Sequence, residues 1–106
     1  MIDLLDAASF ELADASDWYE TRAIGLGDRF LDEVESAFAL IEENQELGSV
    51  WLLEGMPPNV RHFPLQTFPY SIVYVLEPHL VVVAMAHESQ EPRYWIDRLD
   101  EIDRTS

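Results

Sequence analysis

The stretch YSIVYVLEPHLVVVAMA, residues 70–86, decides the fold class of this chain. Residues 70–76 are rich in β-branched and aromatic side chains, which favour strands. Residues 80–86 are apolar at every position, as is typical of a central strand that is covered on both faces. Residues 77–79 leave room only for a tight connection, so the stretch predicts two neighbouring strands in an antiparallel hairpin.

Two more strands are expected before this hairpin. A turn signal at residues 57–59, Pro-Pro-Asn, precedes residues 60–65, which have the composition of a strand. Pro64 has no backbone N–H, and we therefore expect it at a sheet edge or a bulge. Residues 1–5 predict a short strand at the N-terminus.

The first half of the chain predicts two helices, over residues 6–22 and residues 26–46. The short joint between them contains Gly25 and Gly27, which implies an antiparallel helix hairpin. Gly48 stands where the glycine that follows a helix end is expected. The apolar residues recur at helical spacing, on one face of each helix: Ala8, Leu12, Ala15 and Tyr19 in the first, and Leu26, Phe30, Val34, Ala37 and Ile41 in the second.

The expected fold is α+β in a single domain, residues 1–106. Pro92 suits the first position of a last helix, and Trp95, Leu99 and Ile102 follow it at helical spacing. The order is then an N-terminal antiparallel helix hairpin, packed on a small antiparallel sheet, and a C-terminal helix. We expect the helices to gather on one face of the sheet.

The charge of the chain is unusual for its length. Twenty-one acidic residues face six basic residues, all of them arginine, and the formal net charge is −15 at pH 7. Two explanations stay open: adaptation to a high-salt cytoplasm, as in a halophile, or codon bias that replaces lysine by arginine. Such a charge should repel nucleic acid unless the arginines cluster.

Several other classes of protein are disfavoured. The absence of cysteine excludes disulfides and thiolate metal sites. His62, His79 and His87 lack metal-binding spacing, so neither a metal nor a cofactor is expected. The N-terminal residues do not resemble a signal peptide, and the longest apolar run is far shorter than the ~20 residues of a membrane helix. We expect a cytoplasmic protein without membrane contact.

Short segments along residues 8–99 together resemble the RelE/ParE toxin superfamily, which includes plasmid stabilisation proteins. These segments are Trp18-Tyr19-Glu20, Gly25-Leu26-Gly27-Asp28-Arg29-Phe30, Val60-Arg61-His62-Phe63-Pro64-Leu65, Phe68-Pro69-Tyr70-Ser71-Ile72-Val73-Tyr74, Val83-Ala84-Met85-Ala86-His87, and Pro92-Arg93-Tyr94-Trp95 with Arg98. The resemblance implies the toxin of a type II toxin–antitoxin pair, which a small antitoxin neutralises by wrapping a segment around it. RelE-like members cleave mRNA in the ribosome, and ParE-like members inhibit DNA gyrase. The Gly-Leu-Gly joint is more similar to the ParE branch.

A RelE-like activity would be metal-independent cleavage of mRNA through a ribose 2′-hydroxyl. The resemblance implies Arg61, His87, Arg93 and Tyr94 as the groups that supply the base, the cationic donors and the acid. Residues 88–91, however, read Glu-Ser-Gln-Glu, where many family members carry arginine. Two acids close to the phosphate disfavour nuclease activity.

The same residues have other interpretations. Partner binding is expected at Trp18, Arg61, Tyr94 and Arg98. Structural roles are equally open: His87 as a hydrogen-bonded strand end, Arg61 as an ion-paired strand residue, and Tyr94, Trp95, Trp18 and Tyr19 as packing residues. Arg61 and His62 are neighbours on a strand, so they point to opposite faces unless a bulge intervenes.

Three functions therefore stay open. The favoured one is a ParE-like toxin that binds gyrase, because it needs no catalytic residues. The alternatives are a RelE-like mRNA endoribonuclease and a non-toxic family member that binds only an antitoxin-like partner. Antitoxins of the family are commonly acidic, whereas this chain is itself anionic. We predict that the antitoxin interface is mainly apolar or that the antitoxin presents arginines to it.

Overall fold

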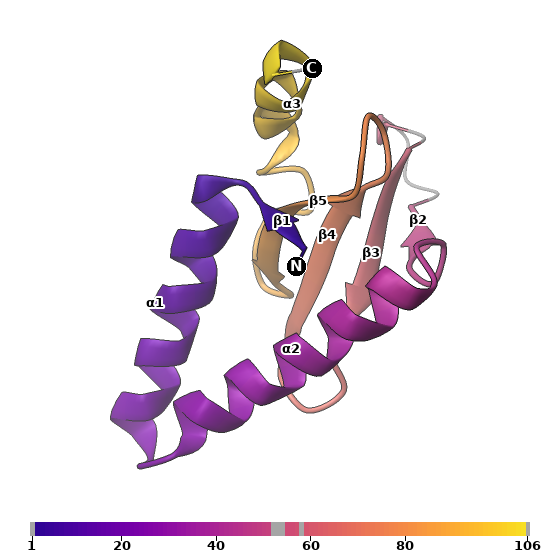
Figure 1. Cartoon of the computed structure of the whole chain (residues 1–106). Helices are drawn as coiled ribbons and strands as arrows, with labels where there is room; N and C mark the ends of the chain where they lie inside the picture. Colours follow the sequence, from indigo (N-terminus) through magenta and orange to yellow (C-terminus); the bar gives the residue numbers. More distant parts are fainter. Residues whose placement is uncertain (1, 52–54, 58, 106) are drawn as a thin grey trace.

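A five-stranded mixed sheet forms the middle of the molecule, and α-helices cover it (Figure 1). The computed structural model describes residues 2–51, 55–57 and 59–105. Met1 of the expected first strand and Pro58 of the expected turn lie outside the described residues. The strands lie side by side in the order β1 (Asp3–Leu4), β5 (Val81–His87), β4 (Tyr70–Val75), β3 (Val60–Pro64) and β2 (Ser49–Val50).

The predicted hairpin is confirmed by the antiparallel pairing of β4 with β5. All residues from Val81 to Met85 are buried, as expected of a strand covered on both faces. The pairing slips once: Val73 faces Ala84 while Tyr74 faces Val82, which leaves Val83 as the extra residue of a β-bulge.

The edge position of Pro64 is also confirmed. The outer strand β2 pairs only with Arg61 and His62, so Pro64 lies beyond its reach, where a missing N–H costs no hydrogen bond. The sequence analysis missed β2, which has only two residues and no alternating pattern.

The sheet is not wholly antiparallel, which corrects the prediction. β1 runs parallel to β5, with Asp3 opposite Val81 and Leu4 opposite Val82. Parallel partners need a long connection, and here both helices and three strands lie between β1 and β5 in the chain. Local sequence patterns carry no information about such a distant pairing.

The helix hairpin consists of α1 (Asp6–Arg22) and α2 (Leu26–Glu43), which diverge from their joint (Figure 1). The bounds predicted for α1 are confirmed. The α2 helix ends at Glu43 rather than at residue 46, because Asn44 has extended backbone angles (φ −140°, ψ 92°). Gly48 does not cap this helix, because its N–H donates to the Tyr74 hydroxyl at 2.7 Å. A Cβ on Gly48 would lie 2.7 Å from the same hydroxyl oxygen, which is too close.

Two hydrophobic cores lie on the two faces of the sheet. Along β4 the side chains alternate: Ile72 and Tyr74 pack with α1 and α2, whereas Val73 and Val75 pack with the C-terminal segment. The expectation that all helices share one face is therefore wrong. Because β4 and β5 are apolar on both faces, each face needs a cover, and the buried Trp95 anchors the second one.

The last helix also begins later than predicted. Residues 92–95 form turns, and a short 3-10 helix, η1 (Ile96–Arg98), leads into α3 (Leu99–Thr105). The bonds from Ile96 N–H to the Arg93 carbonyl and from Arg98 N–H to the Trp95 carbonyl span three residues, which is the 3-10 pattern.

Candidate functional site

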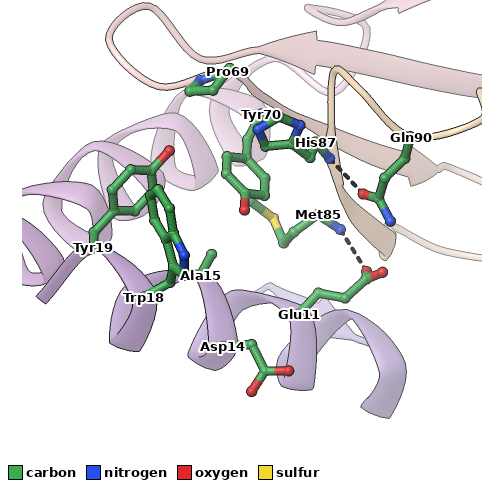
Figure 2. Close-up of a pocket in the computed structure, with 10 residues that line it drawn as sticks. All are labelled: Glu11, Asp14, Ala15, Trp18, Tyr19, Pro69, Tyr70, Met85, His87 and Gln90. Atoms are coloured by element: carbon green, nitrogen blue, oxygen red, sulfur yellow. Dashed lines mark hydrogen bonds between the residues drawn. The ribbon is translucent and has the colours of Figure 1, made fainter. Parts of the chain in front are cut away.

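A groove opens between α1 and one end of the sheet (Figure 2). Its volume is about 630 Å³. Tyr70 begins β4 and His87 ends β5, and the two residues pair with each other, so together they form the sheet wall. One side of α1 forms the opposite wall, which includes Trp18 and Tyr19. The fold thus brings residues from both halves of the chain to one concave surface.

Trp18 is the most exposed large side chain of the groove, with 51% of its surface accessible. Its ring meets the ring of Tyr19 edge-on at 5.1 Å, and the Arg22 guanidinium lies 4.3 Å from its centroid. Tyr19 is buried, as predicted, but a core role for Trp18 is wrong. Successive helix residues point about 100° apart, and α1 is turned so that Tyr19 faces the core while Trp18 faces solvent. Partner binding by Trp18 stays a prediction.

An aromatic cluster in the core includes two residues of the groove walls, Tyr19 and Tyr70. Tyr19, Phe30, Phe68 and Tyr70 contact one another with ring centroids between 4.8 and 6.3 Å apart. Burial raises the pKa of Tyr19, and burial followed by the nearby Tyr19 and Glu11 raises the pKa of Tyr70. Both hydroxyls are therefore neutral donors at physiological pH. This packing, mostly edge-on, holds the Tyr19 and Tyr70 rings in place in the walls of the groove.

Glu11 is the centre of a polar cluster at one end of the groove. Its carboxylate accepts from the Tyr94 hydroxyl at 2.7 Å and from Arg98 Nη1 and Nη2 at 2.8 and 3.0 Å. It also accepts from the backbone N–H of Met85 at 3.1 Å, a bond drawn in Figure 2. Only about a fifth of each charged side chain is exposed (19% for Arg98 and 21% for Glu11).

This cluster forms hydrogen bonds with backbone groups on the open edge of β5. The short β1 covers only Val81 and Val82, so the following residues have no strand beside them on that side. Arg98 Nη1 donates to the Val83 carbonyl at 3.1 Å, and Glu11 accepts from Met85. Two side chains thus replace the missing strand, as buried backbone polar groups require.

Two of the predicted partner-binding residues belong to this cluster. The hydrogen bond to Glu11 raises the pKa of Arg98, and burial followed by the hydrogen bond to Glu11 raises the pKa of Tyr94 far above its ordinary value. Tyr94 and Arg98 therefore hold the C-terminal segment against α1. Their predicted contact with a partner is not tested by these bonds and stays a prediction.

Arg61 has an internal partner as well. It lies on β3, and its Nη1 donates to the carbonyls of Glu46 at 3.2 Å and Gly48 at 2.7 Å. Both carbonyls belong to the loop between α2 and β2, which Tyr74 also holds through its hydroxyl. Arg61 therefore fastens this loop to the sheet.

His87 lies at the sheet end of the groove. Its Nδ1 accepts from the Ser89 N–H at 3.0 Å, which places the proton of the neutral ring on Nε2. The ring meets Tyr70 at right angles with 5.0 Å between centroids. Oriented in this way, the imidazole can present an N–H donor but no acceptor to a ligand.

The structure does not gather the four predicted catalytic residues. Arg61 pairs with Tyr74, and His87 pairs with Tyr70, so about 13 Å of strand separates them along the sheet, with β4 between. His87 and Tyr94 both line a smaller cavity of about 160 Å³. Arg93 is exposed beside Glu91, at 3.7 Å between Nε and the carboxylate. A catalytic role of these residues stays a prediction.

Sequence reasoning missed two features. Glu11 has no distinguishing signal, because it is one of many acids on α1. A stack of Trp51 between His62 and Trp95, at 4.2 and 5.4 Å, was missed because Trp51 lies in a segment without a strand pattern. Burial in this stack lowers the pKa of His62. Within the described ranges, no three histidine or carboxylate side chains are close enough to hold a metal ion.

Taken together, the helix hairpin, the sheet and the C-terminal segment define a small α+β toxin fold of the RelE/ParE type. Residues 2–92 match the family described as "ParE toxin of type II toxin-antitoxin system, parDE". The chain belongs to this ParE toxin family, which confirms the resemblance found in the sequence. No helix in the described part of the chain has both the length and the apolar character to span a bilayer.

A solved structure supports the same fold. A chain of the "Chromosomal ParDE TA system from P. aeruginosa" superposes with a TM-score of 0.56 and 20% sequence identity, covering 82% of this chain and 96% of that one. Comparison with curated proteins gave no match.

Proposed function

We propose that this chain is a ParE-like toxin that acts by binding DNA gyrase and that an antitoxin neutralises it by occupying the groove beside Trp18. Membership of the ParE family supports the toxin role. The groove supports the antitoxin role, because it is a concave surface with an exposed aromatic side chain, Trp18, in its wall.

The internal hydrogen bonds of the arginines favour gyrase binding over RNA cleavage. Cleavage of RNA needs cationic donors that are free to stabilise a pentacoordinate phosphate. Arg61 instead donates to two loop carbonyls, and Arg98 is held by Glu11 and the Val83 carbonyl. Arg93 is exposed but has an acid beside it. Protein contact with gyrase needs none of these groups, and this observation favours it over nuclease action.

The test compares two activities of the purified chain. Gyrase is assayed for supercoiling of relaxed plasmid, and ribosomes are assayed for cleavage of a defined mRNA, each with increasing amounts of the chain. We expect inhibition of supercoiling and intact mRNA. Induced expression should then arrest growth and produce DNA damage, with cellular mRNA preserved.

A double variant, His87→Ala with Arg93→Ala, separates the two mechanisms. Both side chains lie near the surface and bond only to nearby loop residues, so the fold should be kept. The variant should inhibit gyrase as well as the wild type does. If the wild type cleaves mRNA and the double variant does not, while neither chain affects supercoiling, the proposal would be overturned in favour of a RelE-like nuclease. Normal growth together with unaffected gyrase would leave a partner-binding protein without toxicity.

A further inference from the structure

The acidic side chains that line the groove are Glu11 and Asp14, and a cationic side chain lies next to the groove at Arg22, over the Trp18 ring. Glu11 is neutralised by Arg98, at 2.8 Å. Asp14 on the α1 wall is exposed and forms no hydrogen bond or ion pair with the described residues. Glu88 follows His87, and its backbone N–H bonds to the carbonyl of Pro69, a residue of the groove lining. No arginine lines the groove. A ligand therefore meets a mainly apolar surface on which the Asp14 carboxylate has no ionic partner among the described residues.

The aromatic walls suit a cation as well. Trp18 stands on the α1 wall and Tyr70 on the sheet wall (Figure 2). The Arg22 guanidinium lies 4.3 Å from the centroid of the Trp18 ring, which shows that this ring can stack with a cation, and 51% of the Trp18 surface remains accessible to a partner. A cation over an indole gains electrostatic stabilisation that adds to apolar burial.

We propose that the groove binds a cationic, amphipathic segment of a protein partner, in which an arginine or lysine lies between Trp18 and Asp14 while apolar neighbours cover Tyr70 and Met85. This inference rests on the proposed function, under which the partner is the antitoxin. It decides between the two interfaces that the sequence left open, because the segment must carry positive charge and not only apolar side chains.

Other occupants fit less well. An acidic segment or a nucleic acid would bring like charge to a chain of net charge −15. A second copy of this chain would carry the same charge, and its two acidic surfaces would repel each other. Of these occupants, a cationic segment is the one that the net negative charge of the chain attracts over long range and that can also pair with Asp14 at the groove.

The test uses a random library of 16-residue peptides in which acidic and basic residues are equally frequent at every position, so that acidic, neutral and cationic peptides are all present. The library is selected for binding to the full chain at 0.15 M salt, about the physiological ionic strength. We expect enrichment of peptides that combine arginine or lysine with leucine, phenylalanine or tryptophan. The strongest peptide is then measured against single variants by fluorescence anisotropy.

Matched variants distinguish the groove from general attraction to an anionic protein. Trp18→Ser should weaken binding by about tenfold or more, as for a central aromatic contact. Phe10→Ser should change it by less than about twofold, since Phe10 is an equally helical, 70% exposed aromatic outside the groove. Asp14→Asn should weaken binding by about threefold, and Asp32→Asn, with the same loss of charge on α2, should have a smaller effect.

The outcomes separate this inference from the proposed function. Selected peptides that are acidic or neutral, or cationic peptides whose affinity is the same for wild type, Trp18→Ser and Phe10→Ser, would overturn the inference whatever the effect of the chain on gyrase. Cationic peptides that need Trp18 would support it even if gyrase were unaffected, in which case the proposed toxic target fails alone. If both hold, the selected peptide should also be tested for release of gyrase from inhibition.

Discussion

Glu11 and Arg98 lie 87 residues apart in the sequence, and their side chains form a two-bond ion pair, with 2.8 and 3.0 Å between nitrogen and oxygen. The pair joins α1 to the C-terminal segment across the open edge of β5. Each partner also bonds to the β5 backbone, Glu11 to the Met85 N–H and Arg98 to the Val83 carbonyl. Removal of either side chain would leave a largely buried charge and an unsatisfied backbone group.

Glu11→Ala and Arg98→Ala should each lower the free energy of unfolding by about 2–4 kcal/mol, slightly less than for a fully buried pair. The double variant should lose less than the sum of the two, because the second substitution removes a charge that the first left unpaired. Urea unfolding measures all three values. Asp17→Ala is the control, an exposed acid on the same helix, and should change the stability by less than about 0.5 kcal/mol. Equal stability of Glu11→Ala and Asp17→Ala would contradict the importance of the pair.

Tyr74→Phe should lower the free energy of unfolding by about 1–2 kcal/mol. The Tyr74 hydroxyl accepts from the Gly48 N–H at 2.7 Å and donates to the Gln45 carbonyl at 2.8 Å, so its loss leaves two backbone groups of the α2–β2 loop without a partner. Hydrogen exchange of the Gly48 amide should become faster. Tyr70→Phe is the matched control, because the Tyr70 hydroxyl has no hydrogen bond to the described residues. Unchanged Gly48 exchange in Tyr74→Phe would speak against this anchoring role.

The two glycines of the helix joint should respond differently to alanine. A Cβ on Gly27 would lie 2.6 Å from the Ser16 carbonyl oxygen, a backbone atom, so α1 and α2 would have to separate. We expect Gly27→Ala to lower the free energy of unfolding by about 2 kcal/mol or more, as overpacking does. Gly25 has open space around it but a φ of +87°, so Gly25→Ala should cost only about 1 kcal/mol. Thermal and urea unfolding of both variants checks the order, and a larger loss for Gly25→Ala would reverse it.

The stability of the fold should depend on His62 at mildly acidic pH. Burial against Trp51 lowers the pKa of His62 in the folded chain, so the unfolded chain takes up a proton first as the pH falls. The contribution of His62 to stability is full above the ordinary histidine pKa of about 6.5 and is lost as the pH falls from there towards the lower folded pKa. His62→Phe keeps a ring in the stack and cannot titrate.

Urea unfolding of wild type and His62→Phe at several pH values between 8 and 5 tests this dependence. The wild type should lose stability relative to the variant below about pH 6.5. Comparison of the two chains removes the effect of the many carboxylates, which titrate in both. A constant difference over the whole range would show that the pKa of His62 is the same in the folded and unfolded chains.

The sequence predicted the elements whose signals are local. The bounds of α1 follow from apolar residues at helical spacing, and the β4–β5 hairpin follows from two apolar runs around a short turn. The end of α2 and the two-residue β2 were predicted wrongly or missed, because this region is held by distant residues, Tyr74 and β3. The last helix was predicted to begin too early, because residues 92–95 form turns that lead into a 3-10 helix. The parallel pairing of β1 with β5 was also missed, because its two strands lie far apart in the chain.

The candidate site was predicted less completely. Trp18, His87, Tyr94 and Arg98 were named from the resemblance, but their surroundings were not. An exposed Trp18 next to a buried Tyr19 depends on which face of α1 meets the sheet, and the binding of Arg98 to Glu11 depends on how the C-terminal segment crosses β5.

The sequence by itself therefore determined the helical and strand periods, the strongly negative net charge and the family of this protein. Periodicity and composition are properties of neighbours in the chain, and they survive without knowledge of the fold. Only the tertiary structure decided which acid is neutralised and which aromatic ring is open to a partner. These properties arise where residues far apart in the chain meet, and the free energy of a charge or an exposed ring depends on those neighbours in space.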